Sequence, residues 1–111
     1  MKVLNRTDFL GMPAGTIYAK GVQWAFGGVS IKGETLGNDW VCLDPAWVSA
    51  HDSGDAVGRL EEMLEQGASY PGEDAWGRDG CFDADAVFLV FERADLEELR
   101  GHIDRALEVT T

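Results

Sequence analysis

The stretch that most constrains the fold is residues 82–107, where a buried strand leads directly into an amphipathic helix. Residues 86–91 (AVFLVF) form a continuous apolar run, and its length and Val and Phe content predict a strand covered on both faces. From residue 94 onward the apolar period becomes helical. The resulting stripe consists of Leu96, Leu99, Ile103 and Leu107. We expect a helix joined to its strand by so few residues to pack back on its own sheet.

The start of this helix carries a capping signal. Asp95 with Glu98 three residues later predicts a capping box in which Asp95 is the N-cap. Gly101 within the helix costs about 1 kcal/mol relative to Ala, which does not change the prediction.

The first half of the chain alternates between apolar and polar residues, as strands do. Residues 1–4 predict an edge strand, and residues 16–20 (TIYAK) predict a second strand. The runs at 22–26 and 29–32 surround Gly27 and Gly28 and predict a hairpin there, because glycine tolerates the positive φ of tight turns. Trp24 and Trp40 are expected in the core.

Short local signals complete this half of the chain. Thr7 is expected to cap a helical turn over residues 8–11, and residues 33–39 to form a loop. Residues 40–44 (WVCLD) predict a further strand that ends at Pro45.

A first long helix is predicted around Val57, Leu60 and Leu64, with Ser53 or Asp55 as its cap and Gly67 just past its end. Residues 68–81 (ASYPGEDAWGRDGC) then predict an irregular loop. Trp76 lies in this loop and Trp47 in an edge or loop segment after Pro45, and each would act either as a lid on the core or as a binding anchor. The fold class is α+β: one domain over residues 1–111, with a small antiparallel twisted sheet of about four to five strands and two helices packed on one face.

Composition places the chain among globular proteins, with 45% hydrophobic residues. No apolar run has membrane-spanning length, and the N-terminal MKVLNRTDFL lacks the apolar core of a signal peptide, so a cytoplasmic protein is expected. Cys42 and Cys81 fit free thiols in a reducing compartment, although a pair between them stays open.

Charge is unevenly distributed along the chain. The net charge is −11, and the four acids of residues 1–50 cancel four bases, whereas residues 51–111 hold sixteen acids and five arginines. Such a field repels nucleic acid and anionic membrane and attracts basic surfaces. The alternative interpretation is that the excess of acids serves solubility.

Catalytic signatures are missing from the sequence. It contains no P-loop, dinucleotide fingerprint, GxSxG or HExxH motif, and no cofactor is expected. His51, Cys42 and Cys81 lack the paired spacing of zinc ligands. The acids Asp79, Asp83 and Asp85 supply hard oxygen atoms, but their spacing does not match a calcium loop.

Both ends of the chain resemble small uncharacterised proteins encoded by phages and prophages. The resemblance rests on DFLGMPAGTIYAK near the start and GRDGCFDADAVFLVFERADLEEL near the end. It implies a phage context, in which short acidic proteins without catalytic motifs often disable host defences.

Three hypotheses for the function follow. The first is a non-catalytic inhibitor of host anti-phage defence whose acidic residues occupy a basic, nucleic-acid-binding surface of a defence effector. Its predicted contact residues are Glu61, Glu62, Glu65, Glu73, Asp74, Asp79, Asp83 and Asp85.

The second hypothesis is a sponge that sequesters a nucleotide second messenger of the cyclic or ADP-ribose type, in a pocket shared between the subunits of a homo-oligomer. Its predicted ligand-binding residues are Trp76, Arg78, Tyr18 and Lys20, with Arg6 and Lys32 as further phosphate contacts. The third is a metal-dependent hydrolase that uses the acidic stretch around Asp83.

Overall fold

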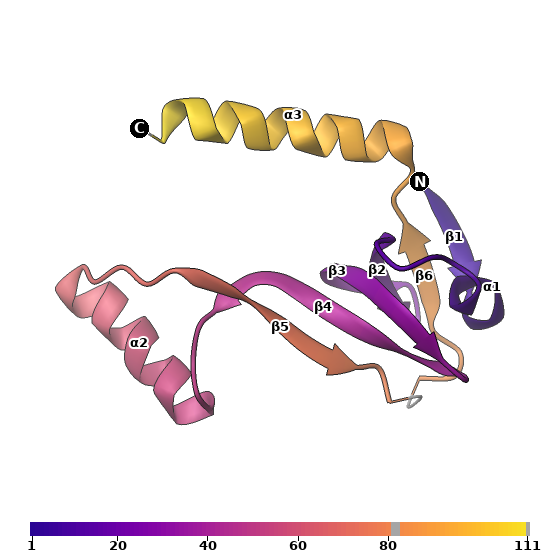
Figure 1. The fold of residues 1–111 in the computed structure, drawn as a ribbon, viewed down its shortest axis with the longest axis horizontal. Coiled ribbons are helices and arrows are strands. Elements are labelled where there is room, and N and C mark those ends of the chain that lie inside the picture. The colour runs from indigo at the N-terminus through magenta and orange to yellow at the C-terminus, as the bar shows by residue number, and fades with distance from the viewer. Residues whose placement is uncertain (81–82, 111) are drawn as a thin grey trace.

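The computed structural model describes residues 1–80 and 83–110, and Figure 1 shows its fold. The strands are β1 (Lys2–Asn5), β2 (Ile17–Val22), β3 (Ala25–Leu36), β4 (Asp39–Val48), β5 (Gly72–Arg78) and β6 (Val87–Val90). The helices are α1 (Arg6–Leu10), α2 (Ser53–Gln66) and α3 (Arg93–Val109).

All strands belong to one antiparallel sheet in the order β1-β6-β2-β3-β4-β5. The predicted α+β class and antiparallel sheet are confirmed, but the counts of four to five strands and two helices are too low. The additional strand is β5, which lies in the stretch predicted to be irregular and pairs with β4. Its glycines and acids do not alternate with apolar residues, so the sequence did not predict a strand there. The segment is a strand because it pairs with β4.

The first hairpin turns at a different place from the predicted one. Val22 pairs with Ala25, so the turn residues are Gln23 and Trp24, both at positive φ (52° and 65°). Gly27 and Gly28 lie inside β3, which continues to Leu36 through most of the predicted 33–39 loop. The cross-strand register therefore overrides the local glycine signal, at the cost of two non-glycine residues in the left-handed region.

The core lies on one face of the sheet, beneath α1. Phe9 of α1 stacks on Phe88 of β6 with ring centroids 4.2 Å apart, and Trp40 meets both rings edge-on. The Trp40 Nε1–H donates a hydrogen bond to the Tyr18 hydroxyl at 2.9 Å. The cluster of buried residues comprises Phe9, Tyr18, Trp40, Ala86, Phe88 and Val90.

The other three tryptophans lie at the surface. Trp40 is buried as predicted, but Trp24 stands in the hairpin turn and is 72% exposed. Trp47 and Trp76 lie in strands β4 and β5 rather than loops, at 63% and 67% exposure. The predictions of a core Trp24 and of lids at Trp47 and Trp76 were therefore wrong.

The long helices do not pack on the sheet as predicted. Neither α2 nor α3 contains a buried residue. Figure 1 shows α2 at the end of the sheet opposite β1, and α3 running from the end of β6 above the strands toward the side of α2, apart from the sheet. The amino group of Met1 forms ion pairs with Glu92 Oε1 (3.2 Å) and Asp95 Oδ2 (2.8 Å), which tie the first turn of α3 to β1 and fix its direction.

The helix caps lie close to the predicted positions. Glu92, not Asp95, is the N-cap of α3, and Asp95 supplies the N3 carboxylate of the capping box. Asp52 caps α2 in place of Ser53 or Asp55, and Asn5 caps α1 in place of Thr7. Gly67 ends α2 at φ 67°, as predicted.

The aromatic core yields a stability prediction. Phe9→Ala removes the ring that touches Tyr18, Trp40 and Phe88, and should lower the free energy of unfolding by about 3–5 kcal/mol. Urea denaturation followed by tryptophan fluorescence measures this change. Val109→Ala, at a residue 77% exposed, is the control and should change it by less than about 0.5 kcal/mol. A similar loss in both variants would contradict the assigned core.

Candidate functional site

Charged side chains from distant parts of the chain meet near the end of β5. Asp79, directly after β5, accepts hydrogen bonds from Arg6 Nη1 at 3.0 Å and from Lys20 Nζ at 2.7 Å. Lys20 also donates to Asp83 Oδ2 at 2.7 Å. The Asp79 side chain is only 7% exposed, so this cluster ties the segment after β5 to β2 and α1.

The same Arg6 covers the indole of Trp40. Its guanidinium carbon lies 4.7 Å from the ring centroid, and its Nε and Nη2 donate to the Asn38 carbonyl at 3.2 and 2.8 Å. The Nε, Nη1 and Nη2 atoms of Arg6 thus all donate hydrogen bonds to groups of its own chain. Arg6 therefore has a structural role and is not presented to a phosphate.

Asp39 forms a second ion pair, in which its own side chain is buried and the Arg78 side chain is exposed. Its Oδ2 accepts from Arg78 Nε at 3.0 Å, and its Oδ1 accepts from the backbone N–H groups of Trp40 and Gly80 at 2.8 and 3.1 Å. Burial raises the pKa of Asp39, but these hydrogen bonds outweigh burial, so its pKa lies below the ordinary value. Asp39 is therefore held as a carboxylate at neutral pH.

Of the four residues predicted to bind a nucleotide, Tyr18 and Lys20 line one hollow of about 320 Å³, whereas Trp76 and Arg78 do not line it. Tyr18 is buried in the core, where desolvation raises its pKa to about 12. Burial by itself would lower the pKa of Lys20, but its hydrogen bonds to Asp79 and Asp83 outweigh burial. The pKa of Lys20 therefore lies above its ordinary value. Arg78 is bound to Asp39, and Trp76 is an exposed residue of β5 opposite Leu43.

Lys32, a further predicted phosphate contact, is also inside the protein. It is 1% exposed, and its Nζ donates to Thr35 Oγ1 at 2.6 Å and to the Gly33 carbonyl at 3.2 Å. Burial lowers the pKa of its ammonium group. Each cationic residue of the nucleotide hypothesis is thus already bound to groups of its own chain. These residues are Lys20, Arg78, Arg6 and Lys32.

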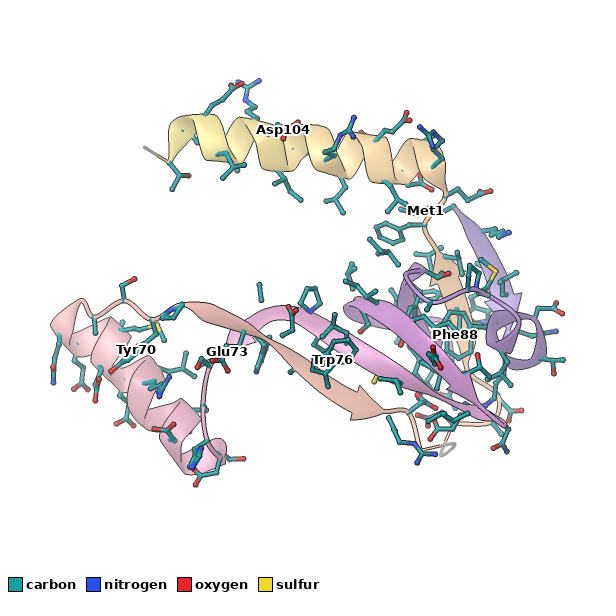
Figure 2. All side chains as sticks on the ribbon, in the orientation of Figure 1. Met1, Tyr70, Glu73, Trp76, Phe88 and Asp104 are labelled. Carbon is teal, nitrogen blue, oxygen red and sulfur yellow. The ribbon has the colours of Figure 1, made fainter. Side chains whose placement is uncertain are left out.

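The predicted contact acids divide into two groups. Asp79 and Asp83 take part in the ion pairs with Lys20, whereas Asp85 is exposed beyond them. Glu61, Glu62 and Glu65 are exposed on α2, and Glu73 and Asp74 are exposed on β5. Figure 2 shows α2 and the Glu73 region on the part of the molecule remote from the Phe88 core.

We call residues 49–77, which comprise α2 and most of β5 with the segments around them, the acidic arm. It contains one arginine, Arg59, and the seven acids Asp52, Asp55, Glu61, Glu62, Glu65, Glu73 and Asp74. Arg59 is bound to Asp55 Oδ2 at 3.5 Å, as its four-residue spacing favours, and to the Ser49 carbonyl at 2.7 Å. A hollow of about 630 Å³ lies beside this pair and is lined by Asp52, Asp55 and Glu73 among others.

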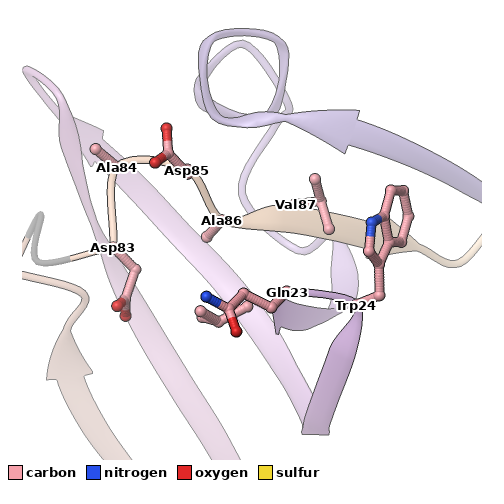
Figure 3. A pocket seen from close by; sticks show the side chains of 8 residues that line it. Gln23, Trp24, Asp83, Ala84, Asp85, Ala86 and Val87 are labelled. Carbon is pink, nitrogen blue, oxygen red and sulfur yellow. The ribbon is translucent and has the colours of Figure 1, made fainter.

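Another hollow, of about 580 Å³, lies between the first hairpin turn and the segment before β6. Figure 3 shows Gln23 and Trp24 on one side, with Asp83, Ala84, Asp85, Ala86 and Val87 opposite. The sequence analysis missed this site, because Gln23 and Trp24 fit a strand pattern and only the register makes them a turn.

Comparison with known proteins finds no matching family model, no similar curated protein and no similar solved structure. In residues 1–80 and 83–110, no group of three or more His, Cys, Asp or Glu side chains is arranged to hold a metal ion. No helix in that part of the chain has both the length and the apolar character to cross a membrane. Cys42 carries a free thiol, and Cys81 lies outside the described residues.

The Asp39 site yields a pH-dependent prediction. Asp39→Asn keeps an acceptor for the backbone N–H groups but loses the charge that holds Arg78. The free energy of unfolding at pH 7 should therefore be lower by about 1–3 kcal/mol. The depressed pKa means that this stabilisation is present above the unfolded-state value of 3.8 and disappears as the pH falls through the lower folded-state value.

Urea denaturation of both proteins between pH 7 and pH 3 measures this difference. The gap between wild type and Asp39→Asn should narrow at the acidic end. Glu98→Gln, on the exposed surface of α3, serves as the control. Its free energy of unfolding should equal that of the wild type at every pH. A pH-independent gap for Asp39→Asn would show that the carboxylate charge is not what stabilises the site.

Proposed function

We propose that the protein is a non-catalytic binding protein whose acidic arm occupies a basic, nucleic-acid-binding surface of another protein. The supporting observation is the concentration of charge: the arm has a net charge of −6 out of the total of −11. A surface with one dominant sign attracts an oppositely charged partner and speeds their association.

The carboxylates of the arm are available to a partner. In the described part of the chain, no lysine or arginine lies within ion-pair distance of Glu61, Glu65 or Glu73. Glu62 accepts a hydrogen bond from the Tyr70 hydroxyl and still lies at the surface. By contrast, the buried acids Asp39 and Asp79 are neutralised internally.

The arm also has room for a basic side chain. The hollow beside Asp52, Asp55 and Glu73 opens between the turn before α2 and β5. An arginine or lysine of a partner would meet three carboxylates there, of which Asp55 already pairs with Arg59. This hollow would anchor the partner, and the acids of α2 would extend the contact.

The resemblance of both chain ends to phage accessory proteins suggests the partner's identity. A host defence effector that binds nucleic acid carries a basic groove, and an acidic protein in that groove would exclude the nucleic acid. The proposed activity is therefore inhibition by occupation, without a catalytic step.

The test uses a triple variant, Glu61→Gln, Glu62→Gln and Glu65→Gln, which removes three charges from α2 while keeping residues of similar helix propensity. Tagged wild-type protein should capture basic, nucleic-acid-binding proteins from host lysate at low salt. The captured proteins should be released by duplex DNA and by high salt. The triple variant should bind at least about tenfold more weakly, equivalent to ~1.4 kcal/mol.

The matched control neutralises Glu97, Glu98 and Glu108 of α3 in the same way, so it changes the total charge equally outside the arm. It should bind its partner as the wild type does. Equal weakening of both variants would indicate a general charge effect, and capture that resists salt and DNA would contradict the proposal.

A further inference from the structure

One face of the sheet carries apolar residues, and among residues 1–80 and 83–110 no helix packs on it. Two cross-strand rows run over it, as the pairing register requires. The first row is Val3, Leu89, Ala19 and Val29, and the second row is Ile17, Ile31, Leu43 and Trp76. We call these eight residues the open face.

The core lies on the opposite side. Tyr18, Phe88 and Val90 alternate with Ala19 and Leu89, so they point to the face that Phe9 covers. On the open face, Val3, Val29 and Trp76 are 46%, 42% and 67% exposed, whereas Ala19 and Leu43 within the two rows are 5% and 9% exposed. A sheet with apolar residues on both faces requires a second covering layer, and α1 supplies only one.

The second unsatisfied surface is the apolar stripe of α3. Leu96 and Leu99, near the start of the helix, are half-buried, but Ile103 and Leu107 are 53% and 66% exposed. Figure 2 shows α3 standing apart from the strands along most of its length. The charged residues of α3 lie off the stripe, so the stripe has the pattern of a helix that packs against another surface.

The exposed area of the chain exceeds what a monomer of this size requires. It exposes 7808 Å², whereas a folded monomer of 12.1 kDa exposes about 6,000 Å². Its radius of gyration is 16.3 Å, against about 13 Å for a compact domain of this length. The excess of about 1,800 Å² per chain would give about 3,600 Å² in a pair, which is the size of obligate homodimer interfaces.

We propose that two copies of the chain form a symmetric homodimer in which the α3 stripe of each copy packs on the open face of the other. In each copy both the α3 stripe and the open face lack a partner within the described residues, so a two-fold axis satisfies these two surfaces at once. A foreign partner would cover only one of them unless it supplied two matching surfaces.

Charge and size fit this arrangement. The eight residues of the open face are uncharged, and α3 has five acids against three arginines, so the joining surfaces repel little. Trp76 is the one residue that the acidic arm shares with the open face, and none of the seven acids of the arm belongs to the open face. Helix α3 has 17 residues and is about 25 Å long. Strand β3 has 12 residues and is about 40 Å long, so the helix fits along it.

The first test is the mass of the full chain in solution, measured by light scattering after size exclusion. The wild type should have twice the mass of 12.1 kDa. Ile103→Glu and Val29→Glu each place a carboxylate in the proposed interface and should shift the protein to monomer. Val109→Glu adds the same charge at an exposed position of α3 outside the stripe and should remain a dimer.

The second test mixes the two monomeric variants. A mixed pair contains one intact site, formed by the α3 of the Val29→Glu chain and the open face of the Ile103→Glu chain. Mixing should therefore restore dimer, although with weaker association than in the wild type. Circular dichroism of each variant, with unchanged helix and strand signals, verifies that both remain folded.

Each other outcome overturns the proposal. A monomeric wild type would mean that α3 folds back on its own sheet or remains free. Dimers that persist in both variants would place the interface elsewhere. Two folded monomeric variants that do not complement each other would exclude the reciprocal exchange. Because the acids of the arm are unchanged in these variants, their capture of a basic partner tests the proposed function separately.

Discussion

The structure depends on an aromatic core that covers only one side of a single sheet. Phe9 stacks on Phe88 and meets Trp40 and Tyr18, so the short helix α1 closes that face. Helix α1 has only five residues, and it leaves the other face without a layer. Because of this constraint, the open face and the apolar stripe of α3 both lack an intramolecular partner in the described residues.

The acidic residues serve two different purposes in this fold. Asp39 and Asp79 neutralise Arg78, Arg6 and Lys20 near the core, and they connect the segment after β5 to the first half of the chain. A buried ion pair of this kind is costly to break, because the remaining charge would lose its partner. In the described part of the chain, Glu61 and Glu65 of α2 and Glu73 of β5 have no basic partner and lie at the surface, which gives the acidic arm its field.

The two proposals assign different surfaces to different partners. A basic partner is attracted by the carboxylates of the arm and should leave when salt screens them. A second copy is attracted by apolar area, which salt does not weaken. Salt dependence therefore separates the two kinds of association in one preparation, and the dimer would present two acidic arms to its partner.

The sequence by itself determined the local elements: the apolar run of β6, the helical stripes of α2 and α3, the glycine at the end of α2 and the charge imbalance between the halves. These features depend on residues two to four positions apart, which the chain specifies directly. Tertiary structure alone decided that the hairpin turns at Gln23 and Trp24, that β5 is a strand, and that three tryptophans are exposed. It also decided which predicted site residues, such as Tyr18 and Asp79, are used inside the protein, because burial and pairing register depend on residues far apart in the chain.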